Sequence, residues 1–181
     1  MDKTIVFTFG RLAPPTIGHQ RLISKVIEVA RLNKADHSIY LSQTQDTIKN
    51  PLSWDFKCRV CESAFKGVVI SRDPEIKTPF MALNSFINNY KNVILVVGQD
   101  QVNEFQERMT PYAESKGFNF SIISSGDRIA DSDDIEGISA SKMRQYAREK
   151  NKKLFLENLP TTLTSGIKEL IYSNTRRGLK I

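Results

Sequence analysis

The sequence predicts an α/β fold built on a five-stranded parallel sheet with helices on both faces, followed by a short helical extension. Two observations predict this fold. Short runs rich in β-branched and aromatic residues alternate five times with segments whose apolar residues recur at helical spacing. The run Val93–Val97 is apolar at every position, as expected for a central strand of a parallel sheet that is buried on both faces.

Local signals predict the individual elements in order. Ser53 is a favoured helix N-cap, and Pro79 suits the first turn of a helix. From Ser139 the chain is predicted to be helical, with a break near Leu159-Pro160. The predicted strands are 4–9, 38–41, 68–70, 93–97 and 120–123; the predicted helices are about 18–32, one after Ser53, one from Pro79, and about 101–116.

Length and composition exclude several classes of protein. The 181 residues are 40% hydrophobic and 25% charged, which is typical of a soluble globular protein. The longest run of large apolar residues, Val93–Val97, falls far short of the roughly 20 that a transmembrane helix needs. The start Met1-Asp2-Lys3 lacks the features of a signal peptide. We therefore expect a cytoplasmic protein with no membrane partner.

The cysteines and the acidic segment are predicted to have structural roles rather than to bind a metal or act in redox chemistry. Cys58 and Cys61 have C-x-x-C spacing, but His19 and His37 are the only histidines, so no second pair of zinc ligands exists. We expect both cysteines to be small helix residues, with one or both of them buried. The segment 125–137 is predicted to be a solvated loop rather than a metal site. Its acidic residues are Asp127, Asp131, Asp133, Asp134 and Glu136.

The positive charge is concentrated at the end of the chain. Residues 1–137 carry 16 Lys and Arg against 17 Asp and Glu, whereas residues 138–181 carry 10 against 3. Such a cluster suits an anionic partner such as a nucleotide, a nucleic acid backbone or an acidic protein, or it forms a solvated basic helix. We predict one domain over 1–145 and a basic helical extension over 146–181 that packs on it.

The first candidate motif follows the first strand. Thr16-Ile17-Gly18-His19 opens a helix, and a helix N-terminus offers unpaired N–H groups and partial positive charge to an anion. Gly18 allows close approach of a ligand to the backbone. His19 can donate a hydrogen bond to a phosphate oxygen, and Arg11 supplies a cation.

The second candidate motif, Ile138-Ser139-Ala140-Ser141-Lys142-Met143-Arg144, opens a later helix. Together the two motifs resemble the T-x-G-H (or H-x-G-H) and I-S-S-T-K-I-R signatures of the nucleotidyltransferase superfamily. That resemblance implies a Rossmann-like, doubly wound sheet and transfer of a nucleotide with release of pyrophosphate. It also implies catalytic roles for four residues: His19, Thr16, Arg144 and Lys142.

Within this superfamily, the sequence resembles the archaeal-type nicotinamide-nucleotide adenylyltransferases in detail. The loop Ser42–Ser53 contains the Asn50-Pro51-Leu52-Ser53 pattern of that family, in which it faces the acceptor nucleotide. Thr16 departs from the family's first histidine. The implied acceptor-binding residues are Ser42, Lys49 and Trp54; the implied nucleotide- and phosphate-binding residues are Phe9, Gly10, Arg11, Gly18, Ser139, Ser141, Gly98 and Asp100.

The resemblance implies ATP and nicotinamide mononucleotide as substrates and Mg²⁺ as cofactor, held mainly by phosphate oxygens and water. A cytidylyltransferase acting on a phosphorylated alcohol or sugar remains open, because the two activities share the pyrophosphate chemistry. A non-catalytic nucleotide- or nucleic-acid-binding module is disfavoured by the two motifs. The tail resembles phage-encoded nucleotidyltransferases, which implies the host cytoplasm. The sequence leaves the oligomeric state open, a homo-oligomer included.

Overall fold

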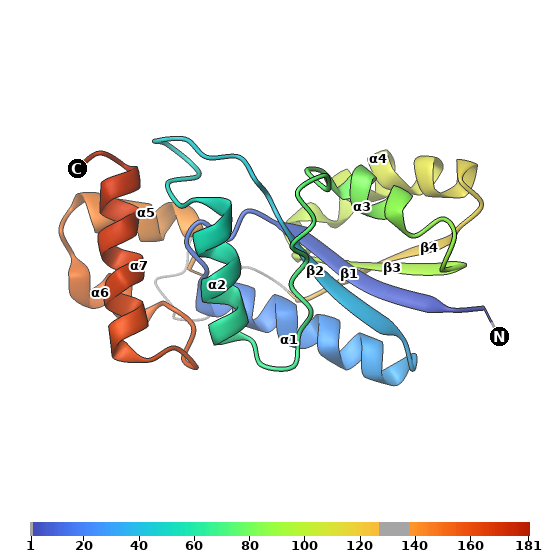
Figure 1. The fold of residues 1–181 in the computed structure, drawn as a ribbon, viewed down its shortest axis with the longest axis horizontal. Helices are drawn as coiled ribbons and strands as arrows, with labels where there is room; N and C mark the ends of the chain where they lie inside the picture. The colour runs from blue at the N-terminus through green and yellow to red at the C-terminus, as the bar shows by residue number, and fades with distance from the viewer. Residues whose placement is uncertain (1, 127–137) are drawn as a thin grey trace. The chain divides into compact units, whose positions relative to one another are not determined.

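The computed structural model describes residues 2–126 and 138–181 (Figure 1). The predicted acidic loop therefore lies almost entirely outside the described residues. The described chain forms two compact units. Unit 1 comprises residues 2–10, 21–40 and 68–126, and unit 2 comprises residues 11–20, 41–67 and 138–181. No helix among the described residues is long and apolar enough to cross a bilayer.

Unit 1 contains the parallel sheet that the sequence predicts. Its strand order is β2-β1-β3-β4, with β1 at Thr4–Gly10, β2 at Asp36–Leu41, β3 at Asn92–Val97 and β4 at Asn119–Ser124. The parallel register pairs Phe7 of β1 with Leu95 of β3, and Leu95 in turn with Ile122 of β4. The α/β class and the central strand with Val93–Val97 buried are confirmed.

The fifth strand of the prediction is wrong. The segment 68–70 forms only an isolated parallel bridge between Ile70 and Ile39. Two backbone hydrogen bonds make this bridge: Ile39 N–H donates to Val69 C=O, and Ser71 N–H donates to Ile39 C=O. Val69 is 58% exposed, so the segment lacks the packing on both faces that would extend it into a strand.

Helices cover both faces of the sheet in unit 1 (Figure 1). On one face, α3 (Pro79–Ser85) and α4 (Val102–Ser115) bury Leu83 and Met109 against Phe7 and Leu95. A 3₁₀ turn at Gln99–Gln101 precedes α4. On the other face runs α1 (Ile17–Leu32), whose first residues belong to unit 2. The alternation along β1 and β3 therefore supplies two apolar layers.

Unit 2 is helical. It contains α2 (Trp54–Ala64), α5 (Ala140–Arg148), α6 (Lys152–Glu157) and α7 (Ser165–Gly178), of which the last three pack together. Ser53 caps α2 as predicted, since its hydroxyl accepts the Phe56 N–H. The predicted break near Leu159-Pro160 is confirmed, and a second break at Glu149–Asn151 separates α5 from α6.

Candidate functional site

The first motif forms a reciprocal cap at the start of α1. The hydroxyl of Thr16 accepts the His19 N–H at 3.3 Å, and Nδ1 of His19 accepts the Thr16 N–H at 3.0 Å. This is a capping box in which histidine replaces the usual glutamate. Thr16 is 1% exposed and His19 is 7% exposed. Because Nδ1 accepts a backbone hydrogen bond, the neutral ring carries its proton on Nε2, which is the nitrogen that can donate to a ligand.

The same turn leaves one backbone donor for a ligand. Ile17 N–H donates to the Asn158 carbonyl at 3.1 Å, and Gln20 N–H donates to the Thr16 carbonyl. The Gly18 N–H has no acceptor among the described residues. A Cβ at Gly18 would lie 3.5 Å from the Thr16 hydroxyl and 3.9 Å from the Ile138 carbonyl, which are ordinary contacts. The protein itself therefore does not need glycine there.

The second motif caps α5 in a more open way. The Ser139 hydroxyl accepts the Lys142 N–H at 3.2 Å. The N–H groups of Ala140 and Ser141 have no acceptor among the residues that the structure describes. Ser141 is exposed, and Lys142 is half-buried with its ammonium 5.6 Å from the ring centre of Tyr146. The start of α5 thus presents two backbone donors and a cation.

Arg144 joins the two motifs. It is buried, and its guanidinium donates to the Ala13 carbonyl at 3.0 Å and to the Ser141 hydroxyl at 2.9 Å. The first bond fixes the loop after β1 to α5. A Cβ at Gly18 would lie 3.9 Å from the Ile138 carbonyl, so the start of α1 also lies near the segment that leads into α5 within unit 2.

Lys57 is a residue that the sequence analysis missed. Its side chain is 0% exposed, and its ammonium donates to the carbonyls of Arg11 at 3.0 Å and Ser42 at 2.5 Å. It therefore ties together the loops that follow β1 and β2. One signal could have found it: Lys57 lies three, four and seven positions before Val60, Cys61 and Ala64, on the buried face of α2.

Two buried cations hold a strained backbone between them. Leu12 is a buried residue with a φ of 44°. This is a left-handed backbone conformation that few residues other than glycine adopt. Lys57 binds the carbonyl before it, at Arg11, and Arg144 binds the carbonyl after it, at Ala13. Such strain persists only where the surroundings fix it, and it is common at functional sites.

The cations of this region repel one another. The pKa of Lys57 is lowered to about 8, mainly by burial; Cys61 and Cys58 oppose this shift, and the Arg11 charge adds a smaller lowering. Burial also lowers the pKa of Arg144, with added repulsion from Arg11 and Arg148 and a partly compensating attraction to Asp46. A group of like charges around two open helix N-termini favours an anionic ligand.

The predicted acceptor loop is rigid around Asp46. Its carboxylate accepts the N–H groups of Ile48, Lys49 and Asn50 and the side-chain amide of Asn50. These bonds, led by that from Lys49, hold the pKa of Asp46 well below its usual range. Lys49 is exposed, Ser42 is buried with its carbonyl bound to Lys57, and Trp54 is half-buried at the first position of α2.

The remaining predicted residues lie in unit 1. Phe9 packs against the core of that unit, and Gly10 ends β1. Gly98 is buried before the 3₁₀ turn, and its carbonyl accepts the Gln101 N–H. Asp100 is exposed within that turn and caps neither it nor α4. Their roles toward a nucleotide stay predictions.

The possible metal ligands and the two cysteines are the last predicted features. No group of three or more His, Cys, Asp or Glu side chains among them could hold a metal ion. Cys58 and Cys61 form no disulfide and are both fully buried on α2, as predicted. Burial is the main reason that the pKa of Cys61 is raised far above that of an ordinary thiol.

Comparison with known proteins places the fold. No protein-family model and no curated protein sequence matches the chain. A solved structure described as a nicotinate-nucleotide adenylyltransferase from Vibrio parahaemolyticus is similar, with a TM-score of 0.58 and 15% identity over 93% of this chain and 98% of that one. Its coverage spans nearly the whole of both chains.

Two further structures are similar over about half of their own length. One is a bifunctional NMN adenylyltransferase/ADP ribose pyrophosphatase from Francisella tularensis, complexed with AMP and a manganese ion (TM-score 0.58, 16% identity, 99% of this chain, 52% of that chain). The other is TmcAL from Thermotoga maritima bound to alpha-thio ATP (TM-score 0.55, 11% identity, 98% of this chain, 56% of that chain). At these identities the likeness shows that the chain shares their Rossmann-like fold.

Proposed function

We propose that the protein is a nucleotidyltransferase that joins a nucleoside triphosphate to a phosphate-bearing acceptor and releases pyrophosphate. The observation that carries this proposal is the joining of the two helix starts in unit 2. Gly18, Ala140 and Ser141 offer backbone N–H groups, the His19 ring lies in the cap of the first helix start, and Arg144 links the two segments. Oriented donors of this kind stabilise charge that develops on phosphate oxygens.

The chemistry needs no general base. An oxygen of the acceptor phosphate attacks the α-phosphorus, the bond from the α-phosphorus to the bridging oxygen breaks, and pyrophosphate leaves with that electron pair. His19 and the α5 N-terminus would meet the negative charge that grows on the leaving group, with Lys142 and Arg11 as further cations. Thr16 would act by fixing the tautomer and orientation of His19. The protein therefore contributes mainly positioning and electrostatic stabilisation.

A divalent cation such as Mg²⁺ fits this site through its substrate. The oxygen ligands that Mg²⁺ prefers would come from the triphosphate and water, since the described side chains around the two helix starts are donors and cations. Bound there, the metal would neutralise phosphate charge. The protein side chains would align the triphosphate against the acceptor.

Nicotinamide mononucleotide with ATP is the substrate pair that we favour. The Asn50-Pro51-Leu52-Ser53 sequence supports it, and two of the similar structures carry adenylyltransferase names with nicotinate nucleotide or NMN as acceptor. A cytidylyltransferase acting on a phosphorylated alcohol or sugar is the alternative, because the two helix starts would serve CTP equally well.

The test is pyrophosphate release with Mg²⁺ and either ATP or CTP, across a panel of acceptors led by nicotinamide mononucleotide. We expect release with ATP and that acceptor, and its loss in His19→Ala. Release only with CTP and another acceptor would keep the reaction class and replace the substrates. Absence of release with every pair would contradict the proposed function.

A further inference from the structure

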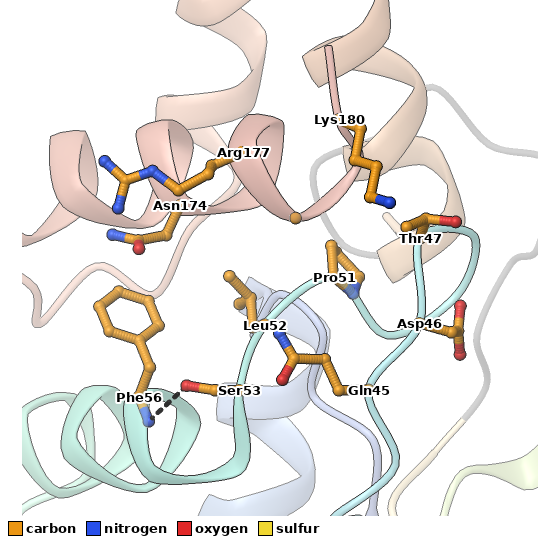
Figure 2. A pocket seen from close by; sticks show the side chains of 11 residues that line it. Gln45, Asp46, Thr47, Pro51, Leu52, Ser53, Phe56, Asn174, Arg177 and Lys180 are labelled. Atoms are coloured by element: carbon orange, nitrogen blue, oxygen red, sulfur yellow. Dashed lines mark hydrogen bonds between the residues drawn. The ribbon is translucent and has the colours of Figure 1, made fainter.

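Two of the cavities in the described chain differ in the charge of their walls. A cleft of about 410 Å³ in unit 2 is lined by the acceptor loop and the end of α7, and Arg177 and Lys180 contribute cations to it (Figure 2). Gly178 lies so close to Pro51 in this cleft that a Cβ would have no room. Because its wall is the acceptor loop, this cleft belongs to the proposed function.

The other cavity, which we call the β2 pocket, lies within unit 1 and has a volume of about 670 Å³. Its described lining includes Ile5 near the start of β1, several residues of β2, and Tyr90 just before β3. It therefore lies beside the amino ends of β1 and β3. Doubly wound sheets bind their usual ligands beyond the carboxyl ends of the strands, where Gly10 and Gly98 lie.

The sequence of β2 explains the polar part of this pocket. Asp36, Ser38 and Tyr40 occupy alternate positions of the strand, so they share one face of it. The ring centre of Tyr40 lies 6.1 Å from that of Phe86, which places this face toward the end of α3. Ser38 and Ser85 are small side chains in the lining, and they leave the space beside the rings unfilled.

Three aromatic rings line the β2 pocket: those of Tyr40, Phe86 and Tyr90. The Phe86 ring centre lies 5.8 Å from that of Tyr90, so the three rings form one continuous group. The pKa of Tyr90 is raised to about 12, mainly by burial and then by its bond to Asp36, so its hydroxyl stays neutral near pH 7. The face of an aromatic ring attracts a cation that lies within about 6 Å.

Asp36 gives the pocket a negative charge. The Tyr90 hydroxyl donates to Oδ2 of Asp36 at 2.8 Å, which holds the carboxylate beside the rings. Among the described residues, Oδ1 of Asp36 has no donor and the carboxylate has no ion-pair partner. An oxygen of this kind can accept hydrogen bonds from a charged donor.

The other charged groups around the pocket leave this negative charge in place. The described lining contains neither lysine nor arginine, and His37 is its other side chain that can carry positive charge. The pKa of Tyr40 is raised mainly by burial; hydrogen bonds with Ser38 and Ser85 oppose this shift, and the Asp73 charge adds a smaller increase. A second carboxylate therefore acts on the same rings.

We propose that the β2 pocket binds a small organic cation that carries an ammonium group on an apolar or aromatic body. Oδ1 of Asp36 would accept hydrogen bonds from the ammonium group, and the rings of Tyr40, Phe86 and Tyr90 would contact the body and attract its charge. An anion would meet like charge in this pocket and no lysine or arginine of the described lining. The site is additional to the proposed transfer of a nucleotide.

The test is a titration of the full ¹⁵N-labelled chain with benzylamine, benzyl alcohol and benzoate, which share one ring and differ in charge. It is made at pH 8, where free imidazole is neutral and benzylamine is still protonated. The amide signals of Ser38, Phe86 and Tyr90 are followed. We expect saturable shifts with benzylamine, an affinity about tenfold lower for benzyl alcohol, and no shifts with benzoate.

Asp36→Asn tests the charge of the pocket. The asparagine oxygen can still accept the Tyr90 hydroxyl, and position 36 is exposed, so the melting temperature should not change. Benzylamine affinity should fall by about tenfold, whereas benzyl alcohol affinity should stay the same. Glu104→Gln is the matched control, because Glu104 is an exposed carboxylate of unit 1 that pairs with Arg108 outside the pocket. It should change neither affinity.

Tyr90→Phe tests how the carboxylate is positioned. The variant keeps the ring but releases Asp36, so benzylamine affinity should fall by less than in Asp36→Asn, with benzyl alcohol affinity unchanged. Tyr112→Phe is its control, because the Tyr112 hydroxyl donates to Asn84 at 2.8 Å and lies outside the pocket lining. Benzylamine affinity in this control should equal that of the wild type.

The outcomes are distinct from those of the proposed function, because His19→Ala should lose pyrophosphate release but keep benzylamine binding. Absence of shifts, equal affinities for benzylamine and benzyl alcohol, shifts with benzoate, or unchanged benzylamine affinity in Asp36→Asn would each overturn the proposal. Shifts of the same amides when the free chain is diluted would identify a second copy of the chain as the occupant, and would overturn it as well.

Discussion

The two units of the chain bury different kinds of side chain. Unit 1 has an apolar and aromatic core in which Phe86 lies 5.2 Å from Phe7 and 5.8 Å from Tyr90, measured between ring centres. Of the ten buried polar or charged residues in the described chain, eight lie in unit 2. They include Lys57 and Arg144, the only buried residues among them with cationic side chains.

This difference agrees with the proposal that unit 1 is a scaffold and that unit 2 carries the chemistry. Burying charge and polar groups costs free energy unless each is well paired, so such groups concentrate where they serve a function. In unit 2 the paired groups fix the loops after β1 and β2 and orient His19. In unit 1 packing alone accounts for most of the buried surface.

The largest effect on stability is expected in unit 1. Phe86→Ala removes a 3%-exposed ring from the aromatic core and should lower the free energy of unfolding by about 3–5 kcal/mol. Denaturant titration measures this. Turnover per folded molecule should stay within about twofold at a temperature where the variant is folded. A large loss of turnover by the folded variant would contradict the proposal that, for the transfer of a nucleotide, unit 1 serves only as a scaffold.

His19→Ala should have the opposite profile. Turnover should fall by about 10²–10³-fold, because a donor to the leaving phosphates is lost. The free energy of unfolding should fall by only about 1 kcal/mol, because the Thr16 N–H loses its acceptor in the cap. Pyrophosphate release and denaturant titration measure the two effects. His19→Asn is the control that can restore the cap, and near-normal turnover in His19→Ala would contradict the assignment.

Lys57 should make stability depend on pH in an identifiable direction. Its pKa is about 8 in the folded chain against 10.5 when unperturbed, so the unfolded chain holds the proton more tightly. Stability conferred by this residue should therefore rise between pH 8 and 10.5, by up to about 3 kcal/mol. The measurement is the difference in unfolding free energy between wild type and Lys57→Met, in which other titrating groups cancel. A difference that is flat or falls over this range would contradict the buried ammonium.

Gly18→Ala should have the smallest structural effect but still impair activity. A methyl group meets only ordinary contacts there, so stability should change by less than about 1 kcal/mol. Turnover should fall by about tenfold or more, because the methyl group would meet a triphosphate that approaches the backbone. Gly166→Ala, also in the first turn of a helix with open space around it, is the control and should keep full activity.

The two units also differ in how far the sequence predicts them. The strands and helices of unit 1 follow from periodicity, since burial of whole faces leaves a pattern in the residues. The exception is 68–70, where three apolar residues meet the strand criterion but only Ile70 is buried and paired with Ile39. Whether a short apolar run joins a sheet depends on tertiary packing that the run does not encode.

In unit 2 the motifs predict where two helices start, but not how those starts are held. The spacing of Thr16 and His19 indicates a helix start, yet the reciprocal cap between them depends on side-chain rotamers. The bonds from Arg144 to Ala13 and from Lys57 to Arg11 join residues far apart in the chain, and backbone carbonyls carry no residue-type signal. The cleft beside α7 likewise depends on the packing of Gly178 against Pro51.

In the proposed function, the starts of α1 and α5 together bind the triphosphate. The most direct measurement is a titration of the ¹⁵N-labelled chain with Mg²⁺ and a non-reactive α,β-methylene ATP, followed at the amides of Gly18, Ala140 and Ser141. We expect the signals of these three amides to shift together with one dissociation constant. His19→Ala should increase that dissociation constant. Shifts confined to other residues, with these three amides unchanged at saturation, would contradict it.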